Sequence, residues 1–151
     1  MPKGKRKNIS FFLLFIFILF FDRLTKSYIL SKLSPHQSIP IIKNIFHFTL
    51  VYNTGIAFGI FKNNNSIFIL ISFIIILLIL KNLRDKSQNK IFKLALVMII
   101  AGALGNLWDR IYFGYVIDFL DLRIWPVFNI ADTSISFGII LILYNTFIKK
   151  S

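Results

Sequence analysis

Long apolar segments separated by short polar ones dominate the chain. Four of these segments are residues 9–29, 62–80, 91–107 and 130–148. Each approaches the roughly 20 mostly apolar residues that a helix needs to cross the hydrocarbon core of a membrane. The pattern therefore predicts an all-α membrane protein with four transmembrane helices, built as a single integral membrane domain over residues 1–151.

Two segments between the predicted helices are not plain linkers. Residues 45–52 (IFHFTLVY) are aromatic and β-branched, and the turn signal Asn53-Thr54-Gly55 follows them. Residues 115–122 (YVIDFLDL) form a second strand candidate, which ends before Pro126. We expect a small extracytoplasmic β-cradle, formed by the outer loops 31–61 and 108–129, resting on the ends of the helices.

The basic residues predict the orientation of the helices. Eleven of the 18 Lys and Arg residues lie before the first segment, around the connection between the second and third, or after the fourth. Cytoplasmic loops carry such an excess of positive charge, so both termini are predicted to lie inside the cell. The first segment also resembles a cleavable signal peptide, but no small-x-small cleavage site follows Phe21. We therefore expect it to remain as a membrane helix.

Composition narrows the chemistry that the chain can perform. It is 56% hydrophobic and 16% charged, with a net charge of +12, no Cys, and six acids that are all aspartates. A basic excess is also typical of nucleic-acid binders, but such proteins lack long uncharged runs, so no nucleic-acid partner is expected. Thiol chemistry is excluded, and His36 and His47 lie outside any metal-binding helix motif. We predict no metal and no cofactor, which leaves the carboxylates as the main reactive groups.

Five of the six aspartates are predicted to lie at the outer membrane surface, which suggests a site. They are Asp22, Asp109, Asp118, Asp121 and Asp132. Most of them also have a structural interpretation. Asp22 and Lys26 have the i, i+4 spacing of an ion pair, and Asp109 with Arg110 forms a local pair that closes the third helix. The small residues from Ala101 to Gly105 are typical of close helix packing in membranes.

Asp118 and Asp132 are the best candidates for a catalytic pair. Asp118 interrupts a strand-like apolar run, a poor place for a charge unless it faces a cleft. Asp132 lies in the first turn of the fourth helix, where the helix dipole alone would favour it. Asp121 is expected to be solvated or paired with Arg123. Two close carboxyl groups share one proton near neutral pH, so that one can activate water while the other polarises a carbonyl group.

Five ordered motifs closely resemble those of bacterial lipoprotein signal peptidase, the type II signal peptidase. They are Asp22-x-x-Thr25-Lys26, Asn53-Thr54-Gly55-x-Ala57-Phe58, Ala101-Gly102-Ala103-Leu104-Gly105-Asn106-Leu107-x-Asp109-Arg110, Gly114-x-Val116-x-Asp118-Phe119 and Phe128-Asn129-x-Ala131-Asp132. Each motif alone is weak, but five in order across nearly the whole chain are specific. Ala101 stands where many members of the family have Gly.

The resemblance implies an aspartic endopeptidase that cleaves prolipoproteins just before a diacylglyceryl-modified cysteine. It assigns catalysis to Asp118 and Asp132. It gives supporting roles to Asn53, Gly105, Asn106, Asp109, Arg110 and Asn129, with Asp22 and Lys26 more peripheral. Expected partners are the prolipoproteins and membrane lipids. The enzyme is expected to be a monomer in the bacterial cell (inner or plasma) membrane, with its site on the extracytoplasmic side.

Two other functions are compatible with parts of the pattern. A small proton-coupled transporter would also use membrane carboxylates, but transporters place them near the bilayer midplane and often show repeated halves. A membrane scaffold that binds anionic lipids would explain the lysines. It would not explain the polar residues at positions 106, 109, 118, 129 and 132.

Overall fold

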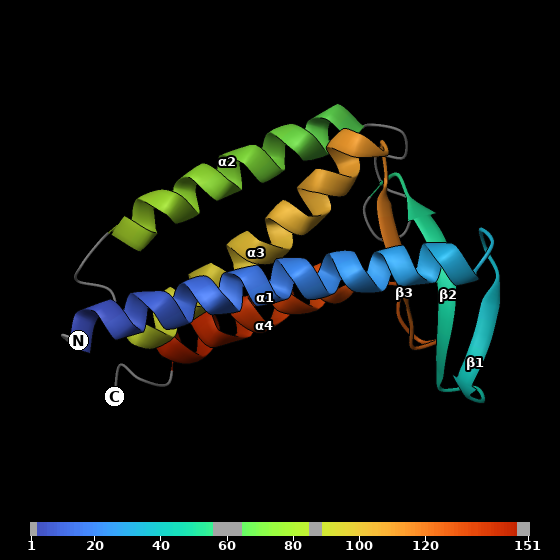
Figure 1. Cartoon of the computed structure of the whole chain (residues 1–151), viewed down its shortest axis with the longest axis horizontal. Helices are drawn as coiled ribbons and strands as arrows, with labels where there is room; N and C mark the ends of the chain where they lie inside the picture. The colour runs from blue at the N-terminus through green and yellow to red at the C-terminus, as the bar shows by residue number, and fades with distance from the viewer. Residues whose placement is uncertain (1–2, 56–64, 85–88, 148–151) are drawn as a thin grey trace.

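The computed structural model describes residues 3–55, 65–84 and 89–147, which form four helices and a three-stranded sheet. The elements in chain order are α1 (Lys3–Lys32), β1 (Ser38–Ile42), β2 (Phe46–Asn53), α2 (Asn65–Arg84), α3 (Lys90–Tyr112), β3 (Val116–Asp121) and α4 (Ile130–Phe147). The helices run lengthwise beside one another, and the sheet lies across one end of them (Figure 1). The start of α1 and the end of α4 lie at the opposite end.

Three of the four helices are long and apolar enough to cross a membrane, counting only the part of the chain that the structure describes: α2, α3 and α4. Helix α1 is longer, and Phe12, Phe17 and Phe20 on it are each at least 60% exposed, as lipid-facing side chains would be. Its apolar run ends at Asp22, so its role as a fourth span stays a prediction, as does the orientation of the helices.

Helices α1, α2 and α3 extend beyond the predicted bounds. Helix α1 covers Lys3–Lys32 instead of residues 9–29, α2 ends at Arg84 instead of residue 80, and the end of α3 differs in a way that affects the site. The predicted outer loop 108–129 was to begin after residue 107, but α3 continues to Tyr112, and the amide of Phe113 still donates to Asp109 O at 2.8 Å. Asp109 and Arg110 therefore belong to the last turns of a helix. Some predicted segments lie partly outside the described residues. They are residues 62–64 of the second predicted span, residues 56–61 of the first outer loop, which include Ala57 and Phe58, and residue 148 of the fourth span.

The sheet contains both predicted strands and one that the sequence pattern did not predict. All three strands are antiparallel in the order β1-β2-β3, and β2 pairs with β3 through partners that include Val51 and Asp118. The additional strand, β1, has every residue exposed and contains Pro40, so it shows no alternation of apolar and polar positions. Proline is tolerated there because β1 is an edge strand.

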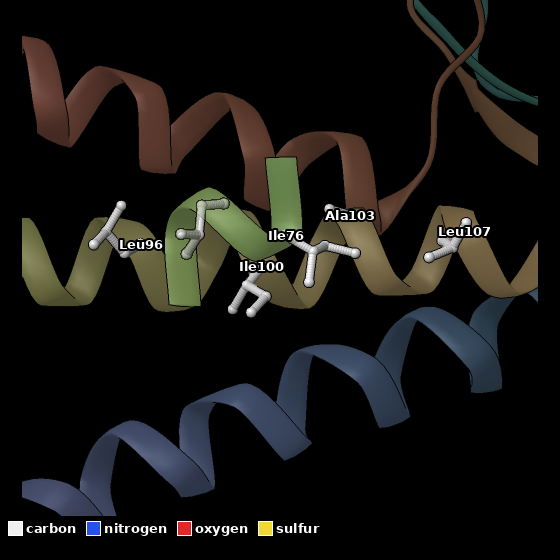
Figure 2. Packing of buried hydrophobic residues seen from close by; sticks show 6 residues of the cluster. Ile76, Leu96, Ile100, Ala103 and Leu107 are labelled. Carbon is white, nitrogen blue, oxygen red and sulfur yellow. The ribbon is translucent and has the colours of Figure 1, made fainter. Parts of the chain in front are cut away.

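Two apolar clusters hold the sheet and the helices in place. Figure 2 shows Ile76 of α2 beside Leu96, Ile100, Ala103 and Leu107, which follow one another along one face of α3. The second cluster joins the end of α1 to the sheet. Its buried members are Ile29, Leu33, Leu50, Ile117 and Phe119. Burial of Ile117 and Phe119 on either side of Asp118 fixes β3, and thereby fixes where that carboxylate lies.

Close packing of α3 against α4 confirms the interpretation of the small residues. A Cβ atom built on Gly102 would lie 2.3 Å from the carbonyl oxygen of Ala131, so only glycine permits this approach. A Cβ atom on Gly105 would lie 2.9 Å from Asp22 Oδ2. These contacts bring the start of α4, with Asp132, beside the polar end of α3.

Candidate active site

Asp118 and Asp132 lie close together at the sheet end of the helices, and one asparagine joins them. Asp118 lies in the middle of β3 and is 1% exposed. Asn129 Nδ2 donates to Asp118 Oδ1 at 2.7 Å, and the amide N–H of the same residue lies 3.2 Å from Asp132 Oδ2. Each carboxylate also accepts a hydrogen bond from a further asparagine, a different one in each case. Asn53 donates to Asp118 Oδ2 at 2.8 Å, and Asn106 donates to Asp132 Oδ1 at 2.7 Å.

The local reason for this arrangement is the start of α4. Asn129 precedes the helix, and its side-chain oxygen accepts from the amide of Asp132 at 2.8 Å, while Asp132 accepts from the amide of Asn129. The two residues form a reciprocal capping box. The structural interpretation of Asp132 is therefore confirmed, and the same capping turns its carboxylate toward Asp118.

Both carboxylates line one cavity of about 250 Å³. Its walls come from the end of β2 and the residues after it, from α3 and β3, and from the first turn of α4 with the segment before it. The lining residues are Asn53, Gly55, Arg110, Asp118, Trp125, Pro126, Val127, Phe128 and Asp132. A second cavity of about 360 Å³ adjoins it through Trp125, Phe128 and Asp132 and extends along α4 among apolar side chains. A polar cavity with an apolar extension could hold a peptide bond together with an apolar group.

Burial and the neighbouring carboxylate change the acidity of Asp118. Desolvation and the charge of Asp132 raise the pKa of Asp118 to about 7. The hydrogen bonds from Asn53 and Asn129 and the charge of Lys26 oppose this rise. Near neutral pH the pair can therefore contain one ionised and one protonated carboxyl group.

Behind the pair lies a buried ionic cluster formed by α1 and α3. Lys26 is fully buried, and its Nζ lies 2.8 Å from both Asp22 Oδ2 and Asp109 Oδ2. Arg23 binds the other oxygen of Asp109. The i, i+4 pair of Asp22 and Lys26 is thus confirmed. Asp22 and Asp109 also accept backbone amides, from Ala131 at 3.0 Å and from Ile117 at 3.3 Å, so the cluster anchors both α4 and β3.

The predicted local pair between Asp109 and Arg110 is wrong. Asp109 turns inward to Arg23 and Lys26, whereas the Arg110 guanidinium lies over the ring of Phe68, 4.7 Å from its centroid, and lines the cavity of the carboxylates. Neighbouring residues on a helix point in different directions, so packing against α1 and α2 separates them.

Arg23 is the member of this cluster that the sequence did not indicate. Its only signal was a second cation beside Asp22 in an otherwise apolar segment. Asp121, in contrast, stays apart from the carboxylate pair. Burial would raise its pKa, but hydrogen bonds from Thr49 and Arg123 and the charge of Arg123 together lower the pKa of Asp121. The predicted pairing with Arg123 is confirmed at 3.0 Å.

No group of three or more His and Asp side chains that could hold a metal ion occurs among residues 3–55, 65–84 and 89–147. The fold and the site together define a helical membrane protein with a buried carboxylate pair in a cavity at one end of its helices. Residues 14–148 match the family described as signal peptidase (SPase) II. The chain belongs to this family, and it is therefore a protease.

Individual relatives agree with this assignment. The chain is 42% identical over 137 residues to the lipoprotein signal peptidase of Moorella thermoacetica, covering 90% of this chain and 91% of the relative. It is 39% identical over 143 residues to that of Clostridioides difficile, covering 93% and 97%. Among solved structures, it is similar to a bacterial membrane enzyme determined by the in meso method, with a TM-score of 0.85 and 33% identity over 91% of this chain and 90% of that one.

Proposed function

We propose that the protein is an aspartic endopeptidase that removes signal peptides from prolipoproteins, with Asp118 and Asp132 as its catalytic residues. The observation that carries the proposal is that Asn129 holds both carboxylates in one small cavity. Family membership and the curated relatives named lipoprotein signal peptidase support the choice of substrate. The bond to be cut is the one just before the diacylglyceryl-modified cysteine.

The chemistry needs one ionised and one protonated carboxyl group. The ionised group takes a proton from a water molecule, whose oxygen attacks the carbonyl carbon of the scissile peptide bond. The protonated group donates its hydrogen bond, and then its proton, to the carbonyl oxygen. When the tetrahedral intermediate collapses, the C–N bond breaks. The carboxyl group that took a proton from water gives it to the departing cysteine nitrogen, and the other carboxyl group regains its proton from a hydroxyl group of the intermediate. A pKa of about 7 for Asp118 suits this exchange at neutral pH.

The place of the site in the membrane is part of the proposal. We infer four spans with both ends of the chain inside the cell, so that the sheet and the carboxylate pair lie at the extracytoplasmic surface of the cell membrane. A lipid-modified cysteine keeps its acyl chains in the outer leaflet, and its scissile bond then lies at the same level. The apolar cavity beside Asp132 is a suitable position for a chain of this kind. The enzyme acts as a monomer that contacts membrane lipids.

The test is cleavage of a purified lipidated prolipoprotein, followed by gel shift. Asp118→Asn and Asp132→Asn should each abolish cleavage while the protein still inserts into membranes, because an amide keeps the shape but cannot exchange the proton. Asp121→Asn is the matched control, because Asp121 binds only Thr49 and Arg123 among the contacts described, and it should keep near wild-type activity. EDTA should leave the rate unchanged. Near wild-type cleavage by either dyad variant, or loss with EDTA that zinc restores, would refute the mechanism.

A further inference from the structure

A lysine buried inside a membrane protein needs an explanation, because its charge is costly to remove from water. Lys26 is 0% exposed, and the three N–H groups of its ammonium face three acceptors. Two are the carboxylates of Asp22 and Asp109, and the third is Asn106 Oδ1 at 3.1 Å. The two carboxylates already balance the charges of Lys26 and Arg23. Charge balance therefore does not account for the contact with Asn106.

The third contact determines which end of the Asn106 amide faces the carboxylate pair. A lysine ammonium can only donate hydrogen bonds, so the atom of Asn106 that faces it must be the oxygen. The nitrogen of the same amide then points to Asp132 Oδ1, to which it donates at 2.7 Å. If the amide were turned over, its oxygen would face a carboxylate oxygen, and the two would repel each other.

The same polarity extends to Asn129. Asn106 Oδ1 accepts a second hydrogen bond, from Asn129 Nδ2 at 3.0 Å. This contact directs the nitrogen of Asn129 toward Asp118, to which it donates at 2.7 Å, and leaves its oxygen for the amide of Asp132. The cation on α1 therefore sets the direction of the Asn106 amide and, together with Ile117 O and the amide of Asp132, contributes to the direction of the Asn129 amide.

We propose that Lys26 is a positioning residue that fixes the orientation of the Asn106 amide and contributes to that of the Asn129 amide, so that their NH₂ groups face Asp132 and Asp118. Lys26 touches neither carboxylate of the pair directly, and it acts through Asn106. This inference rests on the proposed function, because it assigns Lys26 a part in the same site. It also gives α1 an effect on the reaction, transmitted through Asn106, in addition to its role in packing.

The charged groups around Lys26 and around the carboxylate pair define what removal of Lys26 would change. They are Asp22 and Arg23 on α1, Asp109 and Arg110 on α3, Asp118 on β3 and Asp132 on α4. Lys26→Met removes the cation but leaves two buried carboxylates with one partner, and this variant can lose stability for that reason alone. The double variant Lys26→Met with Asp22→Asn keeps the balance of charge and keeps the oxygen that accepts the amide of Ala131.

The experiment measures kcat and KM for prolipoprotein cleavage per folded molecule, with folded protein determined by size-exclusion chromatography. Because Lys26 does not line the cavity of the carboxylates, KM should stay within about twofold in both variants. The value of kcat should fall by about ten- to a hundredfold, as when a group that orients a catalytic residue is removed. Lys32→Met is the matched control, because Lys32 is exposed at the end of the same helix and lies over the ring of Tyr28.

The pH profile provides a readout that a merely structural role would not change. The charge of Lys26 favours the ionised form of Asp118, so its loss should raise the pKa of Asp118. Asp118 is the group that still holds a proton at neutral pH, so the alkaline limb of kcat, where this proton is lost, should move to higher pH by about one unit in Lys26→Met. A kcat per folded molecule within twofold of wild type in the balanced variant, or a loss carried by KM, would overturn the inference. The wild type and Asp118→Asn are measured in parallel. If the wild type cleaves and Asp118→Asn does not, the proposed function holds, and the result for Lys26 can be interpreted separately.

Discussion

Asn129 offers a sharp test because its two ends have different roles. Its oxygen caps α4 by accepting the amide of Asp132, and its nitrogen donates to Asp118 Oδ1 at 2.7 Å. Asn129→Asp keeps the capping oxygen and replaces the donor with a second carboxylate oxygen beside Asp118. Asn129→Ser is the matched control, because serine also caps helices but introduces no charge. The two variants therefore share the lost donor and differ in the added acid.

The size of the effect follows from the distance. Two charges about 4 Å apart repel by about 4 kcal/mol at an effective dielectric constant of about 20. Because Asp118 has a pKa of about 7, both neighbouring carboxyl groups are ionised only above neutral pH. The repulsion therefore raises the pKa of the group that ionises second by about three units above 7. A group whose pKa is higher in the folded state stabilises that state when it is protonated, and this stability is lost as the pH rises through the folded pKa. The free energy of unfolding of Asn129→Asp should thus fall by about 2 to 3 kcal/mol between pH 7 and pH 9, relative to wild type.

The assay is equilibrium unfolding in mixed micelles at pH 6, 7, 8 and 9. Asn129→Ser should be destabilised by about 1–3 kcal/mol, the cost of leaving buried groups without a donor, with a much smaller dependence on pH. If the deficit of Asn129→Asp changes by less than about 1 kcal/mol over this range, the introduced carboxylate does not face Asp118. The arrangement of the pair described above would then be incorrect.

Two further predictions concern the membrane and the substrate. The chain has no cysteine, so a single introduced cysteine can be labelled without background. Lys43→Cys, between β1 and β2, should react in intact cells with a membrane-impermeant thiol reagent, and Lys90→Cys, at the start of α3, should not. Labelling of Lys90→Cys from outside would reverse the orientation. An unlipidated precursor with the same signal sequence should be cleaved more slowly than the lipidated one, because each buried CH₂ of an acyl chain contributes about 0.8 kcal/mol to binding. Equal rates of cleavage, measured by gel shift, would show that the acyl chains have no role in recognition.

The helices and two of the strands could be predicted because their patterns are local. Residues 91–107 and 130–148 are apolar over nearly their whole length, and residues 45–52 and 115–122 combine β-branched and aromatic residues. The strand β1 could not be predicted, since its five exposed residues lack alternation and include a proline. It exists because β2 provides an edge with which it can pair.

The site was predictable in part, for a related reason. Asp132 has a capping signal and Asp118 interrupts an apolar strand, so each is visible within its own segment. The partner of Asp109 was not visible, because Lys26 and Arg23 reach it from α1, far away in the sequence. Lys26, which the resemblance places at the periphery, contacts Asn106 for the same kind of reason. Spacing along one helix cannot indicate a contact that depends on how two helices pack.

These contacts also determine how loss of activity should be interpreted. Asn129 caps α4 and binds Asp118, and Asp109 binds two cations and the amide of Ile117 on β3. A variant at either position removes both stability and geometry, because the groups that orient the carboxylates also join the helices to the sheet. Loss of cleavage alone therefore cannot distinguish a residue that acts in the reaction from one that holds the fold. Only variants that keep one end of the side chain and change the other, as Asn129→Ser and Asn129→Asp do, separate the two contributions.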